Sequence, residues 1–86
     1  MAGVRLRLFA SAREAAGRAG DTFDPETAAT LRRLIEAATA RYGAGFEAVL
    51  GTARIWVNGD EPAAGLDTPL TAGDEVAVLP PVSGGA

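Results

Sequence analysis

The chain has 86 residues, 48% of them hydrophobic and 22% charged, a composition that predicts one small globular domain rather than a disordered chain. The formal charge is −3, and the cationic side chains are all arginines with no run longer than two, which excludes a basic stripe for nucleic acid. Because Cys, His and Lys are absent, the sequence also excludes a disulfide, a thiolate nucleophile, the usual zinc ligands, a histidine general base and a Schiff-base lysine.

The N-terminal segment lacks the pattern of a secretion signal. Arg5 and Arg7 interrupt what would have to be its apolar core. No other stretch of the sequence is apolar for long enough to span a bilayer. We therefore expect no membrane partner, no bound metal and a cytoplasmic location.

The first predicted elements are a strand and a short helix. Residues 4–9 alternate between aliphatic side chains and Arg, Arg and Phe, which is the period of a strand with one buried face. A short helix is predicted over residues 12–16. Ser11 and Glu14 have the spacing of a capping box at its start, and Gly17 is suited to end it.

A second strand and the main helix come next. Residues 21–24 predict a short strand with Phe23 pointing inward. An amphipathic helix is predicted after Thr27 as N-cap and is ended by Gly43, and residues 46–50 predict a further helical turn. The apolar stripe of the main helix consists of Leu31, Leu34, Ile35, Ala38 and Tyr42.

Two more strands complete the chain. Residues 53–57 predict a strand that runs into a type I′ turn at Asn58 and Gly59, since both central positions of that turn require positive φ. Residues 75–79 predict the last strand. Pro80 and Pro81 end it, because proline has no N–H to donate to the sheet.

These elements predict an α+β fold in which a mixed sheet packs on one main helix, with an additional short helix. The helix must cross over between neighbouring parallel strands, and such crossovers are right-handed almost without exception. This is the β-grasp arrangement. We assign residues 1–79 to the domain and residues 80–86 to an extended C-terminal arm.

Two apparent motifs do not predict chemistry. Residues 43–48 have the glycine spacing of a dinucleotide loop but follow a helix, so no strand-to-helix turn would meet the phosphates. The acid pairs Asp60–Glu61 and Asp74–Glu75 each flank a predicted turn, where carboxylates are simply well solvated.

The outward side of the predicted sheet is a better candidate for binding. Strand parity places Phe9, Trp56, Ala77 and Leu79 opposite the helix. Two aromatic side chains and a leucine facing water on a small domain predict a protein-binding patch.

The end of the sequence is the strongest functional signal. A C-terminal carboxylate is a group that ATP can activate as an acyl-adenylate, after which a sulfur or nitrogen nucleophile can take the acyl carbon. Gly84 and Gly85 have no Cβ and suit a narrow channel, and Val82 is the natural apolar anchor. Pro80 and Pro81 stiffen the exit from the sheet so that the arm projects away from it.

The segments VRLRLFASAREAAG, WVNG and LTAGDEVAVLPPVSGG resemble the small, sulfur-carrying subunit of molybdopterin synthase, a member of the MoaD/ThiS family of ubiquitin-like proteins. The similarity spans nearly the whole chain. The resemblance implies a carrier rather than an enzyme, with catalysis on a large synthase subunit. It also implies that an E1-like partner consumes ATP to adenylate the terminal glycine, and that no cofactor is bound by the carrier itself.

The resemblance further implies the roles of individual residues. After adenylation a thiocarboxylate forms on Gly85, next to Gly84, and this group gives sulfur to a cyclic pterin to make the molybdopterin dithiolene. Phe9 and Leu79 match apolar positions near the partner surface of that family, whereas Trp56 is assigned to the patch by parity alone. The inserted arm would consist of Pro80, Pro81, Val82 and Ser83.

Ala86 departs from the Gly-Gly ending of the family. One extra residue moves the terminal carboxylate by up to about 3.5 Å, and a misplacement of about 1 Å can cost roughly a hundredfold in rate. We expect activation only after Ala86 is removed, unless Ala86 is not part of the natural protein. Alternatives are a sulfur carrier for thiamin, cysteine or tRNA thiolation, a ubiquitin-like protein modifier, and a scaffold whose tail has no chemical role.

Overall fold

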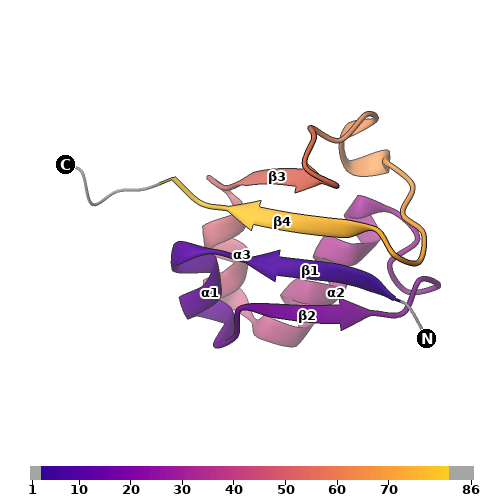
Figure 1. Ribbon diagram of the computed structural model, residues 1–86. Helices are drawn as coiled ribbons and strands as arrows, with labels where there is room; N and C mark the ends of the chain where they lie inside the picture. The colour runs from indigo at the N-terminus through magenta and orange to yellow at the C-terminus, as the bar shows by residue number, and fades with distance from the viewer. Residues whose placement is uncertain (1–2, 82–86) are drawn as a thin grey trace.

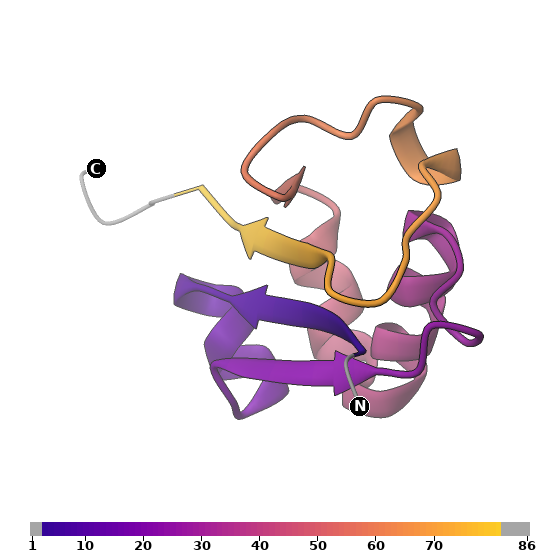
Figure 2. The same ribbon diagram turned by 45° about the vertical axis from the view of Figure 1, so that its right-hand side comes forward.

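The computed structural model describes residues 3–81. Figure 1 shows a mixed sheet with α2 and α3 lying behind it, and Figure 2 shows the same layers after rotation. In chain order the elements are β1 (Val4–Leu8), α1 (Ala10–Ala16), β2 (Gly20–Phe23), α2 (Leu31–Tyr42), α3 (Ala44–Leu50), β3 (Arg54–Val57), the 3₁₀ helix η1 (Gly65–Asp67) and β4 (Glu75–Leu79).

The sheet has the strand order β2-β1-β4-β3. The two central strands, β1 and β4, pair in parallel, while β2 and β3 are antiparallel edge strands. All the other elements lie between β1 and β4 in the sequence, so α2 belongs to the crossover that joins the parallel pair. The mixed sheet predicted from the sequence is therefore confirmed.

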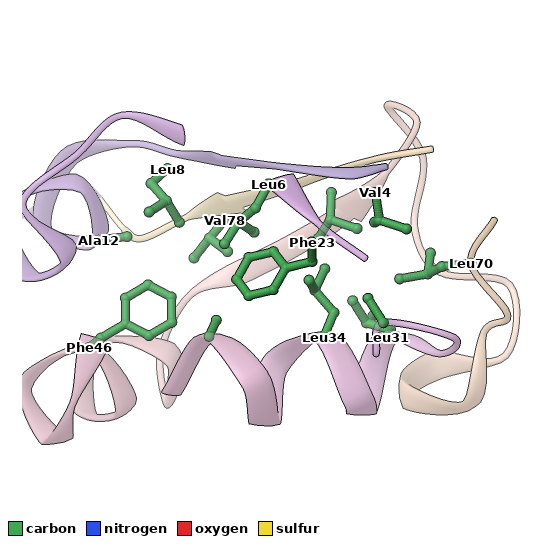
Figure 3. Close-up of a cluster of buried hydrophobic side chains, with 13 residues drawn as sticks. Val4, Leu6, Leu8, Ala12, Phe23, Leu31, Leu34, Phe46, Leu70 and Val78 are labelled. Atoms are coloured by element: carbon green, nitrogen blue, oxygen red, sulfur yellow. The ribbon is translucent and has the colours of Figure 1, made fainter. Parts of the chain in front are cut away.

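The core forms between the inward side of the sheet and the helices. In β1, Val4, Leu6 and Leu8 are buried while the arginines between them are exposed, as the alternation predicts. Figure 3 shows these side chains facing the helices, with Phe23 between the two layers. The buried partners from other elements are Ala12, Leu31, Leu34, Ala38, Phe46, Leu70, Val76 and Val78.

The short helix α1 begins two residues earlier than predicted. Its N-cap is Phe9, whose carbonyl accepts the Ala12 N–H at 3.0 Å, and no side chain caps the helix. The predicted capping box is wrong, because Ser11 and Glu14 both lie inside the helix. The Phe9 N–H is held by the sheet through the Val78 carbonyl at 3.3 Å, and this contact fixes where the chain turns. Gly17 ends α1 in a left-handed conformation, with φ 76°, as predicted.

The N-cap of the main helix α2 lies three residues after the predicted one. Thr30, not Thr27, is the N-cap, and its hydroxyl accepts the Arg33 N–H at 3.2 Å. A contact distant in sequence sets this start, since the Leu31 N–H donates to the Thr68 carbonyl at 3.0 Å. Gly43 ends the helix as predicted, and the expected extra helical turn is the whole of α3.

The turn after β3 is confirmed. Asn58 and Gly59 have φ 52° and 86°, and Val57 and Asp60 exchange backbone hydrogen bonds across it. The turn does not lead directly into β4, because η1 and its flanking loops come first. Asn58 nevertheless reaches β4, since its side-chain oxygen accepts the Glu75 N–H at 2.9 Å. Among residues 3–81, no helix has the length and apolarity needed to cross a membrane.

Candidate docking face and C-terminal arm

The predicted apolar patch, consisting of Phe9, Trp56, Ala77 and Leu79, lies on the sheet face opposite the helices. The strand register places Trp56 directly across from Ala77 in the β3–β4 pair. All three of its strand residues are partly buried, while the flanking inward residues Val76 and Val78 are fully buried. The parity argument therefore predicted the face of these side chains correctly.

Phe9 continues this patch beyond the end of β1. Its N–H bonds to Val78 in the pattern of the parallel ladder, which places Phe9 beside Leu79. The Phe9 side chain is 37% exposed, and the Arg7 guanidinium carbon lies 5.4 Å from the centre of its ring. The patch thus reaches the point where the chain leaves the sheet.

A small open hollow of about 240 Å³ adjoins Trp56 on the β3 side. Ile55 and Pro62 give it an apolar lining, and Arg54 and Glu61 bring one charge of each sign. An aromatic side chain next to a concave surface with few polar groups is typical of a place where a partner side chain inserts. This hollow extends the apolar patch at Trp56, on the edge strand β3.

The alternation of β1 predicts that Arg5 and Arg7 face outward, but the other charges on this face were not predicted from the sequence. Across the four strands, the outward positions hold three arginines, Arg5, Arg7 and Arg54, and one acid, Glu75. Arg5 and Glu75 form a long ion pair of 3.7 Å with both side chains well exposed. Arg54 and Glu75 join Arg5 and Arg7 on this face only through the pairing of the strands, so a count of charges along the chain does not identify the group.

The structure describes the first two residues of the predicted arm, Pro80 and Pro81, which follow the end of β4 at Leu79. Pro80 is buried, whereas Pro81 is exposed, so the assigned arm of residues 80–86 begins with a residue packed into the domain. Figures 1 and 2 show β4 ending at the side of the molecule where α1 lies. The predicted arm residues Val82 and Ser83 and the predicted acyl carrier Gly84-Gly85 lie outside the described residues.

The acids of the second predicted turn have a structural role. The Asp74 carboxylate accepts the Thr71 N–H at 2.8 Å and the Asn58 side-chain N–H at 3.1 Å. The hydrogen bond from the Thr71 backbone, followed by that from Asn58, lowers the pKa of Asp74. This carboxylate stabilises the turn before β4, which agrees with the rejection of the pair as an acid and base. The rejection of a dinucleotide loop also agrees, since Gly43 joins α2 to α3 and residues 44–48 belong to α3, with no strand directly before them.

The sequence pattern of the ThiS family matches residues 6–85, nearly the whole chain. The chain belongs to the ThiS family. The matched range includes the last three residues of β1, the other three strands, the apolar patch and both glycines near the C-terminus. It confirms the family resemblance that the sequence segments indicate.

A curated relative and two solved structures extend this ThiS-family assignment. The chain is 40% identical over 86 residues to the molybdopterin synthase sulfur carrier subunit of Mycosarcoma maydis, covering 95% of this chain and 92% of that protein. The small archaeal modifier protein 1 of Methanosarcina acetivorans is 29% identical, with a TM-score of 0.82 and 96% of each chain covered. A chain in the complex of subunits 1 and 2 of molybdopterin-converting factor from Helicobacter pylori is 28% identical, with a TM-score of 0.67 and 92% and 93% covered.

The comparisons confirm the ubiquitin-like β-grasp fold of this ThiS-family chain, which the solved structures share over nearly its full length. The curated relative is a carrier subunit, in agreement with the prediction of a carrier rather than an enzyme. The roles of the individual site residues, on the patch and on the arm, stay predictions. The structure adds the positions of Phe9, Trp56 and Leu79.

Proposed function

We propose that this chain carries sulfur for the formation of the molybdopterin dithiolene. The observation that carries the proposal is that the apolar patch and the exit of the C-terminal segment lie together, since Phe9 and Leu79 are neighbours at the end of β4. A partner that covers the patch is therefore placed to receive the terminal residues. Support also comes from the family match, which extends through Gly85.

The activation chemistry takes place at the terminal carboxylate of Gly85. The carboxylate attacks the α-phosphate of ATP, pyrophosphate leaves, and an acyl-adenylate forms. A sulfur nucleophile at the oxidation level of sulfide then attacks the acyl carbon, and AMP leaves to give the thiocarboxylate. Because the chain has no Cys, His or Lys, we assign the binding of ATP and the acid–base steps to an E1-like partner. We place this reaction in the cytoplasm.

The second partner in this proposal is the large subunit of molybdopterin synthase. Phe9, Trp56 and Leu79 dock on it, while the arm that begins after the buried Pro80 enters its active site with Gly84 and Gly85 at the tip. Support comes from the Helicobacter pylori structure, which is a complex of subunits 1 and 2 of the converting factor. Using one patch for two partners in turn requires that each complex be reversible.

Reconstitution tests this function directly. The chain ending at Gly85 is converted to its thiocarboxylate and mixed with a synthase large subunit and the cyclic pterin precursor. We expect molybdopterin from this chain and none from the matched control, the same chain with a plain carboxylate. A third chain that still ends in Ala86 should not be adenylated. Failure of the thiocarboxylated Gly85 chain to give molybdopterin would overturn the proposal.

A ubiquitin-like protein modifier is the second candidate, favoured by the similarity to the small archaeal modifier protein 1. The same acyl-adenylate would then react with lysine amines of other proteins. Immunoblots of the native cell under denaturing conditions separate the two candidates, because only the modifier forms lysine-linked adducts. Replacing the pterin precursor with the acceptors of thiamin, cysteine or tRNA thiolation tests the other sulfur pathways with the same thiocarboxylated chain.

A further inference from the structure

A second hollow, of about 570 Å³, opens between β1 and β2. The argument depends on four of its lining residues, Arg5, Arg7, Gly20 and Thr22, and we call it the arginine hollow. The register pairs Arg7 with Gly20 and Arg5 with Thr22, so each arginine faces a small neighbour on the edge strand. The absence of a side chain at Gly20 leaves space beside Arg7 on the outward face of the sheet.

The backbone keeps this space open. A Cβ at Gly20 would stand 3.0 Å from the Leu6 carbonyl oxygen, which is closer than ordinary van der Waals contact. A larger residue would therefore both crowd the β1 backbone and fill the floor of the arginine hollow. Glycine is favoured here by the limited space rather than by an unusual φ angle.

The arginine hollow is positively charged. Arg7 has no ion-pair partner within residues 3–81, and Arg5 has only its long, exposed pair with Glu75. Asp21 also lines the hollow, but it directs its carboxylate to Arg41 and Tyr42 on the other side of the sheet. An unpaired arginine beside one with only a long ion pair is notable on a chain whose formal charge is −3.

The arginine hollow is continuous with the apolar patch. One row of paired residues crosses the sheet from Gly20 through Arg7 and Ala77 to Trp56. Arg7 also lies over the Phe9 ring, so the same side chain borders both surfaces. A protein seated on the patch therefore extends over the hollow.

We propose that the protein partner docked on the apolar patch inserts an aspartate or glutamate side chain into the arginine hollow. Its carboxylate lies between Arg5 and Arg7 and can accept a hydrogen bond from the Thr22 hydroxyl. The planar guanidinium groups suit a carboxylate, and desolvation by the partner strengthens the pair. This inference rests on the proposed function, in which the partner is the synthase large subunit.

The test measures the affinity of a synthase large subunit for the chain ending at Gly85 and for three variants. Arg7→Met keeps an apolar side chain over Phe9 but removes the charge, and Arg7→Lys keeps the charge. Arg33→Met, on an exposed position of α2, is the matched control. We expect Arg7→Met to bind at least about tenfold more weakly and with less salt dependence, Arg7→Lys to recover most of the loss, and Arg33→Met to bind like the wild type.

Further results decide the outcome. The Arg7→Glu variant should regain affinity for a large subunit in which the matching acid is replaced by arginine. If Arg7→Met loses all affinity while its Tm stays normal, this result also supports the inference. Equal affinities for Arg7→Met and Arg33→Met would overturn it while leaving the proposed function intact. If the wild-type chain does not bind the large subunit, both the inference and the proposed function are overturned. Saturable shifts of the Gly20 and Thr22 amide resonances with phosphate alone would overturn the inference in favour of a small-anion site.

Discussion

Asp21 holds β2 to the end of α2. Its Oδ2 atom accepts hydrogen bonds from Arg41 at 2.8 Å and from the Tyr42 hydroxyl, and it forms an ion pair with Arg18 at 3.2 Å. Partial burial opposes ionisation, but the hydrogen bonds from Tyr42 and Arg41 outweigh it and lower the pKa of Asp21 from 3.8 to about 2. The charged carboxylate is therefore more stable in the folded chain than in the unfolded chain.

Asp21→Asn should lower the free energy of unfolding at pH 7 by about 1–2 kcal/mol. Because the pKa of Asp21 is lower in the folded state, its contribution is complete above about pH 4 and is lost as the pH falls toward 2. Urea denaturation of both proteins at several pH values should give stability curves that converge over this interval. Glu36→Gln, at an exposed position of α2, is the control, and a constant gap between wild type and Asp21→Asn would contradict the prediction.

Phe9 and Leu66 allow a matched test of the apolar patch. Their side chains are 37% and 42% exposed, but Phe9 belongs to the patch and Leu66 lies on η1. Phe9→Ala should weaken binding of the large subunit at least about tenfold, since buried aromatic anchors dominate interface energies. Leu66→Ala should leave the affinity unchanged in the same calorimetric titration. An equal loss in the two variants would exclude Phe9 as a specific anchor.

At the scale of elements, the start of α2 depends on the Thr30 cap. Thr30→Ala should lower the free energy of unfolding by about 1 kcal/mol, because it removes the acceptor of the Arg33 N–H. Thr27→Ala replaces an exposed threonine outside the helix, so its effect should be within about 0.5 kcal/mol. Chemical denaturation compares the two variants. A larger loss for Thr27→Ala would place the functional cap where the sequence pattern predicts it.

The elements show which signals are local. Alternating side chains predicted β1 and β4 and the face of each residue, because a period of two is set by the strand itself. Helix starts could not be predicted in the same way. The Val78 carbonyl fixes the start of α1, and the Thr68 carbonyl fixes the start of α2. Both acceptors are far away in the sequence, so the residues around each helix start do not indicate these contacts.

At the scale of the whole molecule, strand pairing brings residues that are far apart in the sequence together into the apolar patch and the arginine hollow. The apolar patch could be predicted because each member follows from its own strand, and its position beside the C-terminal exit follows from pairing β1 with β4. The arginine hollow could not be predicted from the sequence, because it depends on the β1–β2 register and on the missing side chain at Gly20. The burial of Pro80 was likewise not predictable, since its surroundings come from tertiary packing.

Because the apolar patch lies beside the point where the chain leaves the sheet, we expect the length of the arm to determine how far the terminal carboxylate extends into the partner. If the partner is fixed by Phe9 and Leu79, one glycine inserted after Pro81 displaces the terminus by up to about 3.5 Å. The docking residues are unchanged, so affinity for the large subunit should stay within about twofold. The rate of sulfur transfer, measured in a single turnover of the thiocarboxylated chain, should fall roughly a hundredfold because the reacting atoms are misplaced.

A glycine inserted between Ala63 and Ala64 is the control for this insertion. Both residues are exposed and lie in the loop before η1, so the added residue leaves the arm and the patch as they are. This variant should transfer sulfur at the wild-type rate. An unchanged rate after the insertion behind Pro81 would mean that the partner accepts arms of different length, and that the distance from the docked sheet to the terminus does not position the sulfur. A parallel loss of affinity would instead mean that the arm itself contributes to docking.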